Sequence, residues 1–305
     1  MRRFRARTIF LACVLGACGS PPKAPALDEA TQRSSERGNS AFLDGRTEDA
    51  ARAYRRALER GRLMDDAQVI GNAAYNLGVC RLNQGDGAEA ALLFDEALYE
   101  LERADDSLAD ALLMRAKAAA SLGDSAATLT LAERVVSDPR AKAEIHHLAE
   151  VEVLRGELMV TAEDWEGAAD HLTRAKALAG KSDSPWVGSN ILGLEAHLQR
   201  GMGHWVDAAR SFDEQAVALR STGRFAQMAG ALKNAGRSWS QAGYPCEACE
   251  RWVRAARSEA AAGQDSLALV TCKEALSVAE TCDDQATLER TLRLAARLRP
   301  APVAD

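Results

Sequence analysis

The feature that most constrains the fold is a register of small and large apolar residues that recurs along the chain. Equivalent alanines stand at Ala50, Ala90, Ala168, Ala208 and Ala248. Four residues after each comes a large apolar residue, in order Tyr54, Phe94, Leu172, Phe212 and Trp252. Twelve residues before each comes a small residue, in order Gly38, Gly78, Gly156, Ala196 and Gly236. Such self-similarity is typical of stacked repeats, in which each unit covers its apolar face with the next. The register therefore predicts one continuous stack and not two separate domains.

The composition of the chain predicts that the repeating unit is helical. The 305 residues include 61 alanines, and aromatic residues make up only 5% of the chain. Alanine is the best helix former because it loses no side-chain entropy in a helix. Between Ala26 and Arg299 the only prolines are Pro139, Pro185 and Pro245, each at an expected helix start, where proline is tolerated. The chain is predicted to be all-α.

The register resembles that of the tetratricopeptide repeat (TPR), a pair of antiparallel helices. In that repeat, small residues let the two helices approach, and the aromatic of the second helix fills the gap toward the next repeat. The resemblance covers residues 28–262 as six hairpins, of which the third (Asp105–Asp138) is degenerate, with Thr128 at a small position. Residues 263–299 are expected to form a C-terminal capping helix pair. The predicted fold is a TPR-like α-solenoid of about six to seven helical hairpins.

The N-terminal residues have the pattern of an export signal. Four arginines in residues 1–7 precede an apolar stretch of ten residues, which is too short to span a bilayer. The stretch ends in Leu15-Gly16-Ala17-Cys18, which resembles a bacterial lipobox. The resemblance implies that residues 1–17 are a lipoprotein signal peptide and that Cys18 carries lipid. Residues 18–27 would then form an extended tether, and Gly19 favours the outer membrane, facing the periplasm. Residues 300–305 are expected to be a tail.

The charge of the chain bears on its partners. The net charge is −6, and removal of residues 1–17 with their four arginines makes it −10. An acidic protein is poorly suited to bind a phosphate backbone, so nucleic acid is not expected as a partner.

The sequence offers little catalytic chemistry. Gly180-Lys181-Ser182 imitates the end of a phosphate-binding loop, but the position of its first glycine is occupied by Ala175. His146 and His147 lie near Glu144 and Glu150, which are too few ligands for zinc, and we expect a solvated helix face. We therefore predict no catalytic residue, no cofactor and no metal site, and a protein that is not an enzyme.

Four cysteines cluster near the C-terminus: Cys246, Cys249, Cys272 and Cys282. An oxidising compartment favours disulfides, with Cys272 pairing with Cys282 and, less easily, Cys246 with Cys249. Buried free thiols, a four-thiolate zinc site and a redox pair remain as alternatives. Cys80 is expected to be a buried apolar residue.

By the resemblance, the first helix of each hairpin lines a concave groove. The fifth hairpin would present Asn190, His197 and Arg200, and the sixth Lys233, Arg237 and Gln241. The fourth would present Glu150 and Glu157, so the groove would be acidic in its middle and basic toward its C-terminal half. A basic groove suits an acidic or carboxylate-ending peptide. The carboxylate clamp of chaperone-binding relatives is not matched, because its lysine and asparagine are missing from the first repeats.

The leading hypothesis is a membrane-anchored scaffold that binds other cell-envelope proteins or peptides through this groove. One alternative is a thiol- or zinc-dependent module at the C-terminal cysteines. Another is a non-lipidated intracellular TPR adaptor.

Overall fold

The computed structural model describes residues 28–182, 184–279, 281–282 and 285–298. The proposed signal peptide, Cys18, the tether and the tail lie outside these residues. The described part contains one short 3-10 turn, Pro139–Ala141, and fourteen α-helices. The helices are α1 (Glu29–Leu43), α2 (Thr47–Met64), α3 (Ala67–Asn83), α4 (Gly87–Arg103), α5 (Ala109–Ser121), α6 (Ser125–Ser137), α7 (Ile145–Thr161), α8 (Trp165–Ala179), α9 (Pro185–Gly201), α10 (Trp205–Ser221), α11 (Phe225–Gln241), α12 (Pro245–Ala261), α13 (Asp265–Ala279) and α14 (Gln285–Leu298).

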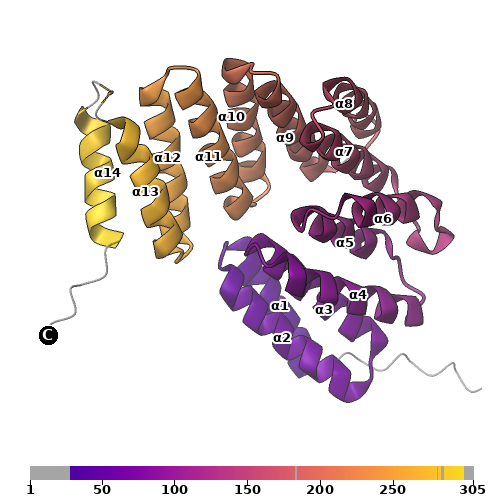
Figure 1. Ribbon diagram of the computed structural model, residues 1–305. Helices are drawn as coiled ribbons and strands as arrows, with labels where there is room; N and C mark the ends of the chain where they lie inside the picture. Colours follow the sequence, from indigo (N-terminus) through magenta and orange to yellow (C-terminus); the bar gives the residue numbers. More distant parts are fainter. Residues whose placement is uncertain (1–27, 183, 280, 283–284, 299–305) are drawn as a thin grey trace, which may run out of the picture.

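Consecutive helices pack as seven antiparallel hairpins, from α1–α2 to α13–α14, and the hairpins stack side by side along a curve (Figure 1). The prediction of an all-α solenoid of six to seven hairpins is confirmed. Turns within the first six hairpins use a left-handed residue, such as Gly243 at φ +83° between α11 and α12. Glu163 takes the same conformation, at φ +59°, between α7 and α8. Among the described residues, no helix combines the length and apolar character that a membrane span needs.

In the second and sixth hairpins, the recurring register is explained by packing between the two helices of the hairpin. A Cβ atom added at Gly78 would lie 2.7 Å from the ring of Phe94, and one at Gly236 would lie 2.9 Å from the ring of Trp252. Both rings are almost fully buried. Glycine in the first helix therefore makes the space that the aromatic ring of the second helix fills. Apolar clusters follow one another along the stack, as expected when each hairpin is covered by its neighbours.

The stack curves so strongly that its sixth hairpin returns to its first two (Figure 1). Gln227 at the start of α11 donates from Nε2 to Asn83 Oδ1 at the end of α3, at 3.4 Å. A Cβ atom at Gly45, in the α1–α2 turn, would lie 3.9 Å from the Cβ of Phe225. We call this meeting of the α1–α2 turn and the end of α3 with the start of α11 the seam. The seam turns the open concave face of a solenoid into the wall of a partly enclosed space.

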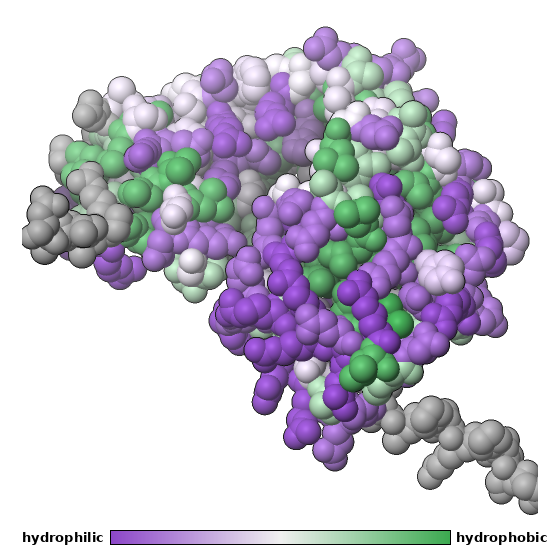
Figure 2. Space-filling view, turned by 60° about the horizontal axis from the view of Figure 1, so that its bottom comes forward, coloured by the Kyte–Doolittle hydropathy of each residue, from purple (hydrophilic) through white to green (hydrophobic). Residues whose placement is uncertain are grey.

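Seen from below, the surface is mixed (Figure 2). Hydrophobic residues form a band across the N-terminal hairpins and a second group at the α13–α14 end, with hydrophilic residues between them.

Candidate functional site

The concave face encloses a cavity of about 530 Å³, which we call the central cavity. Its walls come mainly from the first helices of the first six hairpins, because these helices face the inside of the curve. The apolar part of the lining includes Phe42, Tyr75, Val79, Leu82 and Trp186. The polar part comprises the amides Asn76, Asn83, Asn190 and Gln227 and the ionisable residues Asp110, Lys117, His146, His147, Glu150 and Arg224. A concave, mainly apolar lining with a few converging polar groups is the usual form of a binding site.

Glu150 is the most buried acid of the cavity, and its carboxylate is fully satisfied. Its side chain is only 2% exposed. Lys117 on α5 places its Nζ 2.7 Å from Glu150 Oε2, and Asn190 on α9 donates from Nδ2 to Oε1 at 2.5 Å. The three groups join α5, α7 and α9, so this network fixes the relative positions of three hairpins.

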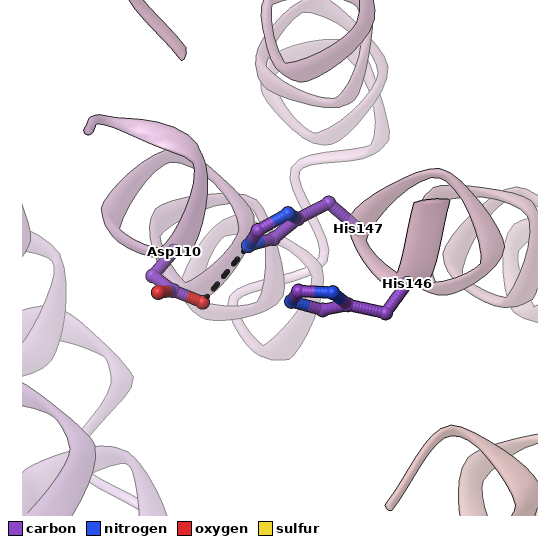
Figure 3. Close-up of side chains that lie close together, drawn as sticks. All are labelled: Asp110, His146 and His147. Atoms are coloured by element: carbon purple, nitrogen blue, oxygen red, sulfur yellow. Dashed lines mark hydrogen bonds and ion pairs between the residues drawn. The ribbon is translucent and has the colours of Figure 1, made fainter. Parts of the chain in front are cut away.

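His147 lies in the first turn of α7, and both of its ring nitrogens make hydrogen bonds (Figure 3). Its Nδ1 accepts a hydrogen bond from the backbone N–H of Glu144 at 2.9 Å, so the ring proton of the neutral form sits on Nε2. Nε2 then donates to Asp110 Oδ1 across 3.2 Å. This hydrogen bond holds the pKa of Asp110 below its usual range. The expectation of a solvated helix face is wrong for His147, which is buried because it caps its own helix and faces α5.

His146 lies beside His147 and forms part of the cavity wall. The centroids of the two imidazoles are 3.8 Å apart, and His146 packs edge-on against Trp186 with centroids 5.9 Å apart. One ligand atom each from Asp110, His146 and His147 lies within 4.8 Å of the others, which is close enough to consider a metal. Coordination through His147 Nε2 would require its proton to move to Nδ1, against the backbone N–H of Glu144. The cluster therefore suits a hydrogen-bonded wall better than a metal site.

Arg224, in the turn between α10 and α11, is the cation of the cavity that lacks an ionic partner. Its guanidinium lies over the indole of Trp186, 5.8 Å from the ring centroid. Among the described residues, no carboxylate oxygen lies within ion-pair distance of it. Burial lowers the pKa of Arg224, and the negative charge of Glu150 opposes that effect. The group stays charged, because the pKa of arginine is far above neutrality.

Of the groove residues predicted from sequence, Glu150 and Asn190 line the central cavity. The others, Glu157, His197, Arg200, Lys233, Arg237 and Gln241, do not. The ring of His197 packs against Phe212, with centroids 5.2 Å apart, and burial lowers its pKa to about 4. Arg200 lies over the same phenyl ring at 5.6 Å, and its pKa is lowered by burial and by the nearby charge of Arg237. Both residues thus support the packing of α9 on α10.

The basic half of the groove is largely neutralised. Lys233 pairs at 2.7 Å with Glu259, whose side chain is 2% exposed, and Arg237 pairs at 3.0 Å with Glu274. Gln241 is exposed at the end of α11. The expectation of a free basic surface is therefore corrected, because buried or neighbouring acids of later helices take up these cations. Glu157 is half-buried in the middle of the concave face, and burial raises its pKa.

The structure pairs Cys246 with Cys282, with Cα atoms 5.0 Å apart, and both expected pairings are wrong. The helices α12 and α13 are antiparallel, so the start of α12 lies beside the residues that follow α13. Cys272 is inside α13, seven residues before its end, and Cys272 and Cys249 are each buried in an apolar cluster. With two of the four sulfurs joined, these cysteines do not form a four-thiolate zinc site.

Sequence reasoning missed Arg224, Lys117, Asp110, Tyr75 and Trp186. Four of them lie on first helices of hairpins. They would have been found if the expectation that first helices line the groove had been applied to every repeat. Arg224 lies in a turn, and only the curvature of the whole stack brings it to the cavity.

Comparison with protein-family models found no match, and comparison with curated proteins found none either. Solved structures share the fold. A Rap protein complexed with competence and sporulation factor is 16% identical over 88% of this chain and 87% of that one, with a TM-score of 0.59. A signal transduction ATPase with numerous domains from Pyrococcus horikoshii, which has a tetratricopeptide repeat sensor, is 12% identical with a TM-score of 0.59. That match covers 83% of this chain and 39% of the other. The fold of this chain is therefore a TPR-like solenoid.

Proposed function

We propose that this protein is a membrane-anchored adaptor, without catalytic activity, that binds an extended segment of another envelope protein in its central cavity. The observation that carries the proposal is the enclosure of the concave face at the seam. An open solenoid offers a shallow groove, whereas this one surrounds a space of about 530 Å³. Enclosure buries more of a ligand's surface and so increases the gain from each apolar contact.

The lining of the cavity supports a polypeptide ligand. Each side-chain amide can both donate and accept, which matches the alternating N–H and C=O groups of a peptide. Asn76, Asn83, Asn190 and Gln227 spread these amides over α3, α9 and α11. The aromatic walls, with Tyr75 and Trp186, suit the apolar side chains between those groups. The Rap protein of the same fold was solved with its factor bound, which is consistent with a ligand-binding role for such a stack.

Two observations support the export part of the proposal. The Leu15–Cys18 segment has the form of a lipobox. The Cys246–Cys282 disulfide suits an oxidising compartment such as the periplasm, since cytosolic thiols are kept reduced. The outer membrane is the proposed site of anchoring.

Binding in the cavity is tested by photo-crosslinking in cells. A photoreactive amino acid replaces Leu82, which lines the cavity, and in a matched control it replaces Leu92, which is 72% exposed on α4 outside the lining. We expect a defined adduct with an envelope protein at position 82 only. Equal adducts at both positions, or none at position 82, would contradict the proposal.

Anchoring is tested by the intact mass of the protein from the membrane fraction. Wild type should begin at Cys18 and carry lipid, and Cys18→Ala should not. The mass of the unprocessed chain would favour an intracellular adaptor without a lipid anchor.

A further inference from the structure

The charges of the central cavity are unequally satisfied. Both of its acids have partners within the protein: Asp110 accepts from His147, and Glu150 accepts from Lys117 and Asn190. Lys117 is matched by the same contact with Glu150. Within the described residues, Arg224 alone among the lysines and arginines of the lining has no carboxylate at ion-pair distance. The cavity therefore has an uncompensated positive charge at one known place.

The surroundings of Arg224 are suited to an anion. Its guanidinium is held over Trp186, which leaves its N–H donors available at the rim of the ring. Tyr75 lines the same cavity, and its hydroxyl makes no hydrogen bond within the part of the chain that the structure describes. Tyr75 and Arg224 line the same cavity, where burial raises the pKa of Tyr75 and the charge of Arg224 opposes that rise. A half-buried guanidinium gains strongly from a carboxylate, because the pair forms charge-assisted hydrogen bonds.

We propose that Arg224 binds the side-chain carboxylate of an aspartate or glutamate in the bound segment, with the hydroxyl of Tyr75 as a second donor. This inference rests on the proposed function, since it specifies the chemistry of the ligand. A side chain fits better than a chain terminus because the amides of the lining lie on several helices. Asn76, whose side chain makes no hydrogen bond among the described residues, and Asn190, which keeps a free donor, are placed to hold main-chain groups. A ligand held along its backbone presents its charge as a side chain.

The test uses the full-length protein, immobilised, and three random heptapeptide libraries. The first has acidic side chains and an amidated C-terminus, the second has no acidic side chain and a free C-terminal carboxylate, and the third has neither. We expect selective retention from the first library. Individual peptides selected from it should bind Arg224→Gln on the order of 10- to 100-fold more weakly, since a charged hydrogen-bonded pair is lost. Tyr75→Phe should weaken binding less, and Arg224→Lys should restore part of it.

Arg220→Gln is the matched control, because it removes an exposed arginine four residues away and changes the net charge equally. It should bind like wild type, and circular dichroism should show the same helix content in all variants. Retention from the second library only would mean that the cavity binds a C-terminal carboxylate and not an acidic side chain, which would overturn the inference. Equal retention from all three libraries would overturn it while leaving peptide binding in place. If no library is retained, peptide binding by the cavity fails, and the inference fails with it.

Discussion

Gln227 at the start of α11 donates a hydrogen bond to Asn83 at the end of α3, although 144 positions of sequence separate them. The bond is exposed and long, and a bond of that kind contributes little stability. Its value is geometric, since it marks the place where the curve closes. Closure of the curve therefore decides which residues line the central cavity, including Arg224.

Closure at the seam predicts a cross-link. In the double variant Gly45→Cys/Phe225→Cys, the two Cβ atoms would lie 3.9 Å apart, which is within the range for a disulfide. Gly45 has φ +77°, so cysteine there costs about 1–2 kcal/mol, which the bond offsets. We expect a disulfide between the two positions, shown by peptide mapping under non-reducing conditions. Either single variant is the control. If the two thiols stay reduced in the presence of a mild oxidant, the seam is open in solution.

The register of small residues predicts opposite effects of alanine at two helical glycines. Gly78→Ala forces its Cβ against Phe94 and should destabilise the fold by about 1–3 kcal/mol. Gly230→Ala, in α11, meets nothing within 4 Å and should stabilise it by about 0.5–1 kcal/mol, because alanine is the better helix former. Urea unfolding measures both. Equal effects of the two substitutions would show that the Gly78–Phe94 packing is looser than described.

The lowered pKa of His197 predicts that the protein loses stability in mild acid. Its folded pKa, lowered to about 4 by burial and by Arg200, lies below the ordinary value of 6.5, so the unfolded chain takes up a proton first. The contribution is complete above about pH 6.5 and is lost as pH falls toward 4. Relative to His197→Leu, the wild type should lose about 2 kcal/mol of unfolding free energy between pH 7 and pH 4.5. An imidazole NMR signal of His197 that titrates near pH 6.5 would refute this.

The disulfide predicts a local effect of reduction. Cys246 and Cys282 close a loop of 36 residues, which in the chain-entropy account contributes about 3–4 kcal/mol. In a stack each hairpin contacts mainly its neighbours, so Cys246→Ser/Cys282→Ser should speed hydrogen exchange in α13 and α14 and leave α1–α4 unchanged. Reductant should reproduce this in wild type and have no effect on the variant. Faster exchange along the whole chain would mean that the stack unfolds as one unit.

The architecture could be predicted because it is local. The pattern of Ala90 followed by Phe94 recurs in five of the hairpins, and the third hairpin, with Thr128 at the small position, still forms its two helices. The disulfide was open to prediction as well, since antiparallel α12 and α13 bring Cys246 beside Cys282. Pairing cysteines by nearness in sequence missed this.

The enclosure of the site at the seam could not be predicted, because it depends on the sum of small angles between successive hairpins. Each hairpin turns slightly from the one before, and only the total over six hairpins decides whether Arg224 lines the same cavity as Tyr75. Lys233 was misjudged for a related reason. Its acid partner Glu259 is on the next helix, α12. The sequence prediction took account only of the residues on the first helix of each hairpin.

Enclosure at the seam has a consequence for how such a chain can change over time. An open stack of repeats tolerates duplication or loss of a unit, because no distant part depends on the count. Here one additional hairpin between α6 and α7 would carry Gln227 away from Asn83 and Arg224 away from Tyr75. We therefore expect insertion of a hairpin to be tolerated after α11 and to disrupt the cavity before it.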